Sequence, residues 1–195
     1  IPGPRAITLD SGVQILIKDF SKEEDEFIKK ALSTVPKRVQ ESIAGINAGC
    51  KELGFGQPAH CHWNRTICIR PICLTSYGTI CEYLWHEAGH AYTMKLRTFT
   101  REWAAVAGSV YGASWRPDNN LFPHAGILES HGTRDAMEDI ACWVKAVYSC
   151  FNDQHHRFGG YMREDPRYIA KLNLLWQYGF ISKEQHDKVT IFISR

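Results

Sequence analysis

Residues 79–96, TICEYLWHEAGHAYTMKL, decide how the rest of the chain is interpreted, because they combine a helical pattern with a candidate metal-binding motif. Apolar side chains recur every four residues in this stretch, at Ile80, Leu84, Ala88 and Tyr92. This spacing places them on one face of an amphipathic helix, which we expect over about 78–96. Ser76 or Thr79 precedes the apolar stripe and can cap its N-terminus.

The motif within this helix is HEAGH, residues 86–90. On a helix, His86 and His90 lie one turn apart on the same face and can bind one zinc ion through two ring nitrogens. Glu87 lies beside them and can take a proton from a zinc-bound water, which is the task of a general base in metal-assisted hydrolysis. HExxH also arises by chance, so an ordinary helix without metal is the alternative.

The remaining pattern predicts an α+β fold in which helices dominate. A strand is expected at 13–18, and another around Ile67 and Ile69, which suits a sheet edge because Pro71 follows it. Further helices are expected at 22–34, 38–53, 101–109, 134–151, 164–178 and 182–193. Residues 112–133 are rich in Gly, Pro, Asn and His and are expected to form a long ordered loop.

Composition limits the classes of protein that are possible. With 195 residues, 44% hydrophobic and 23% charged, the chain has the composition of one globular domain. We expect an N-terminal lobe over about 1–96 and a C-terminal helical lobe over about 97–195. The net charge of +2 with scattered basic residues gives no reason to expect nucleic acid as a partner. No apolar run is long enough to cross a membrane, and we expect a monomer.

Cysteine usage favours an extracellular protein. Five of the seven cysteines fall within residues 50–81, and none of the spacings is CxxC. Asn64, Arg65 and Thr66 form a glycosylation sequon beside this cluster. The N-terminus IPGPR is not a signal peptide, and a chain that starts without Met has the appearance of a mature product. We therefore expect a secreted protein with at least one disulfide, whose pairing the sequence leaves open.

A catalytic zinc needs a third protein ligand, and Glu138 is the best candidate. It stands with Asp139 in the mostly apolar segment AMEDIACWV. A carboxylate in such a helix either faces solvent or has a buried partner. The competing interpretation is a solvated cluster of acids, because carboxylates are favoured near a helix N-terminus in any case.

Residues 65–151 resemble the catalytic core of the anthrax lethal-factor-like zinc peptidases, a group that includes the bacterial Pro-Pro endopeptidases. The resemblance rests on RTICIRPICLTSYGTICEYLWHEAGHAYTMKL, REWAAVAG and SHGTRDAMEDIACWV. It implies a zincin-like fold with a small sheet, an edge strand before the HExxH helix, and a Trp-bearing short helix after it. It also implies that His86, His90 and Glu138 bind Zn2+ and that Glu87 is the general base.

Two positions depart from the family pattern. His131 stands where the family has a Tyr that donates a hydrogen bond to the developing oxyanion, and an imidazolium can do the same. Cys142 stands where the family has a second acid, so the orientation of a zinc-binding His must come from elsewhere. We expect Cys142 to be either disulfide-bonded or a plain buried cysteine, and not to pair with Cys150.

A rival ligand scheme comes from GTRD, residues 132–135, which resembles the GTxD of the aspzincin fungal peptidases. In that scheme Asp135 is the third zinc ligand. Asp135 and Glu138 are three residues apart on one helix face, so either can reach the metal. The Tyr-Gly that follows GTxD in aspzincins is missing here, which favours Glu138.

The expected function is a secreted zinc metalloendopeptidase whose zinc-bound water is activated by Glu87. Its partner is a peptide or protein substrate, aligned as an added strand along the edge strand near Ile67 and Ile69. The second hypothesis is a degenerate peptidase fold that binds zinc or a partner without hydrolysis. His60 and His62, in PAHCHWN, are expected in a surface loop rather than in a second metal site, and His124 is a candidate cleft residue.

Overall fold

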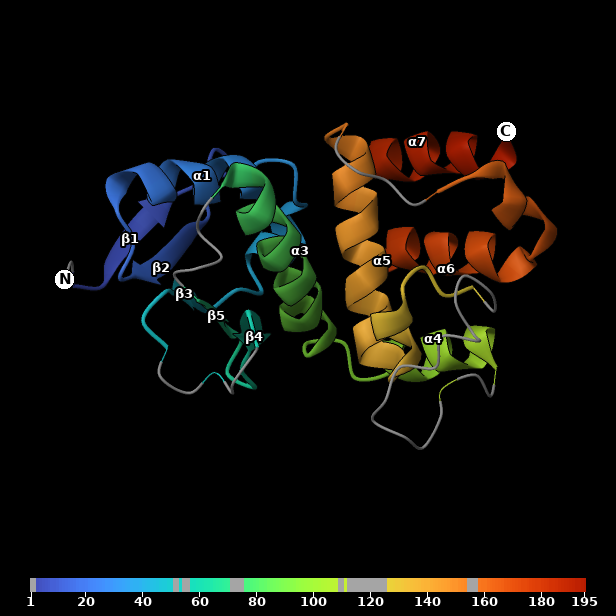
Figure 1. Ribbon diagram of the computed structural model, residues 1–195, viewed down its shortest axis with the longest axis horizontal. Coiled ribbons are helices and arrows are strands. Elements are labelled where there is room, and N and C mark those ends of the chain that lie inside the picture. Colours follow the sequence, from blue (N-terminus) through green and yellow to red (C-terminus); the bar gives the residue numbers. More distant parts are fainter. Residues whose placement is uncertain are drawn as a thin grey trace. The chain divides into compact units, whose positions relative to one another are not determined.

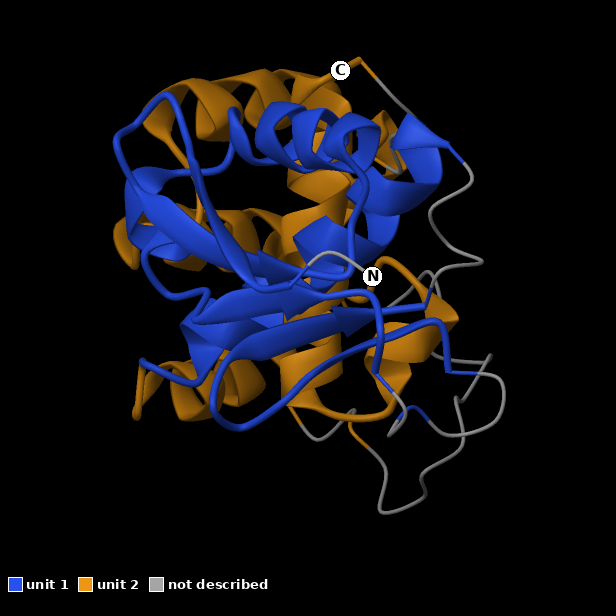
Figure 2. Cartoon of the chain, turned by 90° about the vertical axis from the view of Figure 1, so that its left-hand side faces the viewer, with its two compact units in different colours: residues 1–95 blue, residues 96–195 orange. Residues whose placement is uncertain are grey.

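The computed structural model describes residues 3–50, 53, 57–70, 76–108, 111, 126–153 and 158–195. The chain divides into two compact units, residues 1–95 and 96–195, which Figure 2 shows in different colours. This division lies close to the boundary expected between the two lobes. That the two units act as one catalytic domain stays a prediction.

In its described residues, unit 1 consists of a small mixed sheet and three helices (Figure 1). In chain order its elements are β1 (Arg5–Thr8), β2 (Gln14–Lys18), α1 (Lys22–Leu32), α2 (Lys37–Gln40), β3 (Gly45–Asn47), β4 (Ala59–Cys61), β5 (Thr66–Ile69) and α3 (Tyr77–Thr93). The strand order across the sheet is β1-β2-β3-β5-β4. The β2–β3 and β3–β5 pairs are parallel, and the two outer pairs are antiparallel.

The two faces of this sheet carry different kinds of side chain. The register places Ile17, Ile46 and Ile67 side by side, and each is no more than 1% exposed. They face the core of unit 1, to which α1 and α3 contribute apolar side chains. The same register places Lys18, Asn47 and Cys68 side by side on the opposite face.

Two expectations for unit 1 are wrong. The helix expected at 38–53 ends at Gln40, and Gly45–Asn47 form the central strand β3. Tertiary pairing overrides the local preference here, because Ile46 is buried between two parallel neighbours. The strand expected at an edge is β5, which pairs with β3 on one side and β4 on the other, so β4 is the edge strand. Pro71 lies outside the described residues.

The helix starts in unit 1 follow the sequence signals. Ser21 caps α1 in a capping box with Glu24, whose carboxylate accepts a hydrogen bond from the Ser21 N–H. Ser76 caps α3, and its hydroxyl accepts a hydrogen bond from the Thr79 N–H at 3.2 Å. Local capping therefore fixes where the HEAGH helix begins.

Unit 2 is helical in its described residues. Its elements are α4 (Phe99–Ala107), η2 (Ser130–Thr133), α5 (Ala136–Phe151), η3 (Gly160–Glu164), α6 (Pro166–Gln177) and α7 (Lys183–Ser194). In Figure 1, α5 runs across the direction of α6 and α7. The four α-helices confirm the expected pattern, with shifts of a few residues at their ends. Residues 112–125 of the expected long loop, including His124, lie outside the described residues.

Aromatic side chains fill the core of unit 2. Trp103 of α4 and Trp143 of α5 are fully buried, with ring centroids 6.0 Å apart in an edge-to-face arrangement. Phe99 packs on Phe180 with centroids 4.6 Å apart. The structure is thus α+β and rich in helix. None of the described helices is long and apolar enough to span a membrane.

Candidate metal centre

The HEAGH helix brings two ring nitrogens together within unit 1. The Nε2 atoms of His86 and His90 lie 3.2 Å apart, and the two rings meet edge to face. Two ligand nitrogens at about 2.1 Å from a tetrahedral zinc ion are separated by about 3.4 Å. The two histidines of unit 1 are therefore spaced as two ligands of one metal ion.

Packing within unit 1 fixes the orientation of this pair. The expected stripe of α3 is confirmed, since Ile80, Leu84 and Ala88 are fully buried and Tyr92 is 6% exposed. Trp85, next to His86, is fully buried, and its indole N–H donates to the Ala31 carbonyl of α1 at 2.8 Å. The helix is thus held on more than one side, which limits its rotation about its own axis.

Glu87 is a buried carboxylate, only 6% exposed. It lies close enough to the Cys61 thiol of β4 for its charge to affect that thiol. Burial, and after it the negative charge of Glu87, raises the pKa of Cys61 to about 12. Cys61 therefore stays protonated at neutral pH, and it forms part of the surroundings of the candidate general base.

Unit 2 carries the expected third ligand, Glu138, and the expected oxyanion donor, His131. Glu138 lies in the first turn of α5, and its Oε2 is 2.9 Å from Nε2 of His131 in η2. Its other oxygen, Oε1, is 3.8 Å from the guanidinium of Arg134. Within this unit, the structure thus places the expected oxyanion donor against the expected third ligand.

Asp135, the rival ligand, has a structural task. It is the N-cap of α5, and its Oδ1 accepts hydrogen bonds from the backbone N–H groups of Met137 and Glu138 at 2.8 and 3.0 Å. This is the usual role of an aspartate at a helix start. These capping bonds use one of the two carboxylate oxygens of Asp135, Oδ1.

Asp139, the neighbour of Glu138, is the centre of a buried polar cluster. Its Oδ2 accepts hydrogen bonds from the Lys171 ammonium at 2.5 Å, the Trp103 indole at 2.8 Å and the Tyr111 hydroxyl at 2.5 Å. The side chains of Asp139 and Lys171 are both 0% exposed. Lys171 also donates to the Gly126 carbonyl at 2.8 Å. The cluster ties α4, α5 and α6 together directly beside Glu138.

Burial and pairing act in opposite directions on this cluster. Burial raises the pKa of Asp139 and lowers that of Lys171, while the opposite charge of the partner counteracts each shift. Burial, followed by the negative charge of Asp139, raises the pKa of Tyr111, so its hydroxyl remains a donor. The donors all reach Oδ2 of Asp139, while the buried Oδ1 has no hydrogen-bond partner among the described residues.

The structure answers part of the question of how the cysteines pair. Cys50 and Cys68 form a disulfide, which confirms that the chain carries one. Cys142 is a buried free thiol that does not pair with Cys150, and burial raises its pKa well above the ordinary value. Cys73 lies outside the described residues.

The histidines of PAHCHWN do not form a second metal site within the described residues. His60 is exposed on β4, and His62 lies in the turn between β4 and β5. Nε2 of His62 is 3.1 Å from Sγ of Cys68.

Sequence reasoning missed three members of these surroundings, namely Cys61, Tyr111 and Lys171. For Asp139 the sequence held a usable signal, because Asp139 is spaced four and eight residues from Trp143 and Val147, both fully buried. An acid on that stripe requires a buried partner. No pattern along the chain identifies Lys171, which is 32 residues away.

Comparisons with models of protein families, with curated proteins and with solved structures gave no match to this chain.

Proposed function

We propose that this chain is a secreted zinc-dependent metalloendopeptidase. Its zinc ligands are His86, His90 and Glu138, and its general base is Glu87. The observation that carries the proposal is the 3.2 Å separation of the two histidine Nε2 atoms on one face of α3, with the buried Glu87 carboxylate between them in sequence. Peptides or proteins are the proposed substrates, and the Cys50–Cys68 disulfide is compatible with an extracellular location.

The donor set fits zinc. Two imidazole nitrogens and one carboxylate oxygen are the protein ligands of many catalytic zinc sites, which leave a further position for water or substrate. The proposal assigns Glu138 of unit 2 as the carboxylate ligand that joins the two histidines of unit 1. The capping bonds of Asp135 favour Glu138 over the aspzincin-like scheme.

The residues of the chain divide the chemistry between them. Bound zinc would supply Lewis acidity, which lowers the pKa of water and polarises the scissile carbonyl. Glu87 accepts the proton of the attacking water and passes it to the leaving amine.

His131 has two possible tasks, and its contact with Glu138 bears on both. A hydrogen bond to Glu138 at 2.9 Å orients the carboxylate of a zinc ligand. The same imidazole donates to the developing oxyanion if it leaves Glu138 during the reaction. A variant at His131 separates these tasks, because a lost orienting role weakens zinc binding while a lost donor lowers only kcat.

The test combines zinc analysis with a peptide-library digest, with and without a chelator. The wild-type chain should contain one zinc ion and lose all cleavage when the metal is removed. Glu87→Gln should keep the zinc and lose activity by about 10²–10⁴-fold, the usual contribution of a general base. Glu82→Gln is the matched control, since Glu82 is an exposed glutamate of the same helix.

Two results would contradict the proposal: a Glu87→Gln variant with full activity, or a folded wild-type chain that takes up no zinc. A third result supports the second candidate function, a zinc-binding protein without hydrolysis. The contact between His131 and Glu138 favours that candidate, because it engages the expected oxyanion donor. One zinc per chain and no cleavage of any library peptide would establish it.

A further inference from the structure

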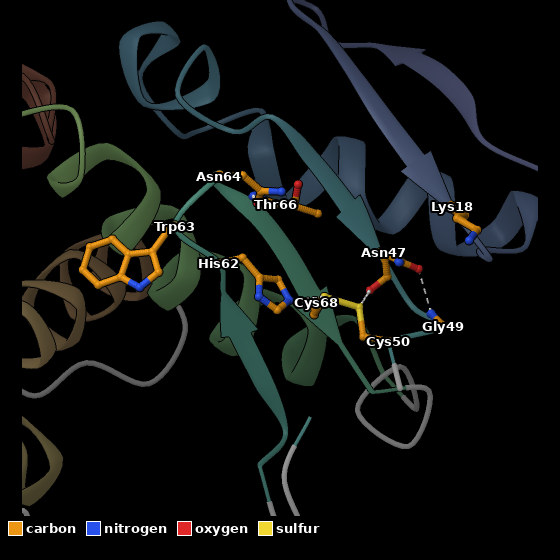
Figure 3. A pocket seen from close by; sticks show the side chains of 9 residues that line it. All are labelled: Lys18, Asn47, Gly49, Cys50, His62, Trp63, Asn64, Thr66 and Cys68. Atoms are coloured by element: carbon orange, nitrogen blue, oxygen red, sulfur yellow. Dashed lines mark hydrogen bonds between the residues drawn. A yellow bond between two sulfur atoms is a disulfide. The ribbon is translucent and has the colours of Figure 1, made fainter. Parts of the chain in front are cut away.

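A pocket of about 650 Å³ lies on unit 1, with the Cys50–Cys68 disulfide in its wall (Figure 3). Its lining residues are Lys18, Asn47, Gly49, Cys50, His62, Trp63, Asn64, Thr66 and Cys68. The strand residues among them include the Lys18, Asn47 and Cys68 row of the sheet face opposite Ile17, Ile46 and Ile67. The volume suffices for a ligand of small-peptide size.

The two sulfur atoms of the disulfide are not equivalent. Cys68 is 2% exposed, whereas Cys50 is only half-buried. His62 contacts the buried sulfur, with Nε2 3.1 Å from Sγ of Cys68, and Figure 3 shows the ring turned toward the disulfide. An incoming nucleophile therefore has better access to Cys50, while Cys68 has a hydrogen-bonding partner.

This asymmetry matches the needs of thiol–disulfide exchange. In that reaction a thiolate attacks one sulfur, and the other sulfur leaves as a thiolate. The leaving thiolate departs faster when a nearby donor stabilises its negative charge. His62 is placed to donate from Nε2 to Cys68 once Cys68 carries that charge.

The charge of the pocket indicates which thiols suit it. Lys18 is the cation among the described lining residues, and no Asp or Glu is among them. Its ammonium is half-exposed and has a loose ion pair with Asp19 at 4.0 Å. Asn47, Asn64 and Thr66 add polar groups suited to amides and carboxylates.

We propose that this pocket is an exchange site for small anionic thiols of the peptide type. The thiolate of the ligand attacks Sγ of Cys50 and forms a mixed disulfide with it. The Cys50–Cys68 bond breaks, and Cys68 leaves as a thiolate that accepts a hydrogen bond from His62. One thiolate is consumed and one is formed, so the step needs no further oxidant or reductant. The proposal does not depend on zinc or on peptide hydrolysis.

The test treats the native, zinc-loaded chain with reduced glutathione, followed by acid quenching and peptide mapping by mass spectrometry. Glutathione should appear on Cys50, with Cys68 released as a thiol. His62→Phe should react about fivefold more slowly, because phenylalanine keeps a ring but offers the leaving thiolate no hydrogen-bond donor. Lys18→Ala should slow the reaction with glutathione but not with the uncharged thiol 2-mercaptoethanol, and Lys37→Ala, an exposed lysine of α2, should change neither rate.

Three results would overturn the proposal: glutathione found on Cys68 instead of Cys50, equal rates for wild type and His62→Phe, or reaction only after denaturation. Circular dichroism of each variant excludes misfolding as the cause of a changed rate. If Lys18→Ala slows both thiols equally, the charge preference is wrong and the exchange itself stands.

Discussion

The two units hold their candidate metal ligands by different forces. In unit 1, His86 and His90 project from a helix that is fixed by apolar packing and by one buried indole hydrogen bond from Trp85. In unit 2, Glu138 projects from a helix that is fixed by an ion pair with 0% exposed side chains, Asp139 and Lys171. Apolar packing tolerates small changes of shape, whereas a buried charge depends on every one of its partners.

These different forces determine which substitutions should destabilise each unit. Loss of one methylene group from α3 leaves its capping bonds in place, and the helix can adjust its packing. Loss of one charge from the Asp139 cluster leaves the opposite charge buried without compensation. Changes to the polar partners of Asp139 should therefore destabilise unit 2 abruptly. Small changes in the apolar packing of α3 should destabilise unit 1 only gradually.

The largest effect is expected from the buried ion pair. Asp139→Asn should reduce the free energy of unfolding by about 3–5 kcal/mol, because Lys171 then remains buried without its counter-charge. Urea unfolding followed by tryptophan fluorescence measures this loss, since Trp103 and Trp143 lie in the same core. The matched control is Asp187→Asn, which removes an exposed ion pair with Lys183 and should change stability little.

The double variant Asp139→Leu, Lys171→Met sharpens this prediction. It removes both charges together, and most of the lost stability should return because no unpaired charge remains. A double variant as unstable as Asp139→Asn would show that the hydrogen bonds to Trp103 and Tyr111 matter more than the charge balance.

A smaller loss of folding stability, confined to alkaline pH, is expected in unit 1. The pKa of Cys61 is raised to about 12 by burial and by Glu87. A raised pKa stabilises the fold below the ordinary pKa of a thiol, about 8.5–9. This stabilisation is lost as the pH rises from there toward 12, by up to about 1.4 kcal/mol for each pH unit.

Urea unfolding between pH 8 and pH 10.5 measures this slope. Cys61→Ala should make it shallower, since the alanine variant has no thiol to ionise at this position. Cys142 and Cys150 contribute slopes of their own in unit 2, because burial raises their pKa values as well. An unchanged slope in Cys61→Ala would show that Cys61 does not contribute to the loss of stability at alkaline pH.

The smallest effect is expected at the helix cap. Asp135→Ala should cost about 1 kcal/mol through the lost capping bonds of α5 and leave zinc content unchanged. Ser182→Ala, at the cap of α7, is the matched control with a similar cost. If Asp135→Ala loses zinc and Ser182→Ala keeps it, Asp135 and not Glu138 is the third ligand.

Local signals predicted the helices of both units, because caps and apolar stripes act within a few residues. Ser76 and the Ile80 stripe have the roles expected of them. The central strand β3 could not be found in this way, because three residues become a strand only through pairing with β2 and β5. The short strand β4 was missed for the same reason, and its pairing with β5 makes β4 rather than β5 the strand at that edge of the sheet.

The residues of the candidate site also differ in whether local sequence predicts their contacts. His86, Glu87 and His90 are adjacent in sequence, so helix geometry alone predicts their relation. The contacts of Glu138 with His131 and of Asp139 with Lys171 join separate elements, and only the fold reveals them. The disulfide partner of Cys50 was likewise open, because seven cysteines allow many pairings.

The parallel pairing of β2, β3 and β5 has a consequence for how the chain reaches its structure. Each parallel pair joins segments separated by a long stretch of chain, such as Lys18 with Asn47 and Asn47 with Cys68. Bringing distant segments together carries a loop-closure cost before any contact compensates for it, and folding slows accordingly. The helices of unit 2 form mostly from near neighbours in sequence. Folding of unit 1 should therefore be the slow step when the chain refolds, and the HEAGH helix should reach its final position late.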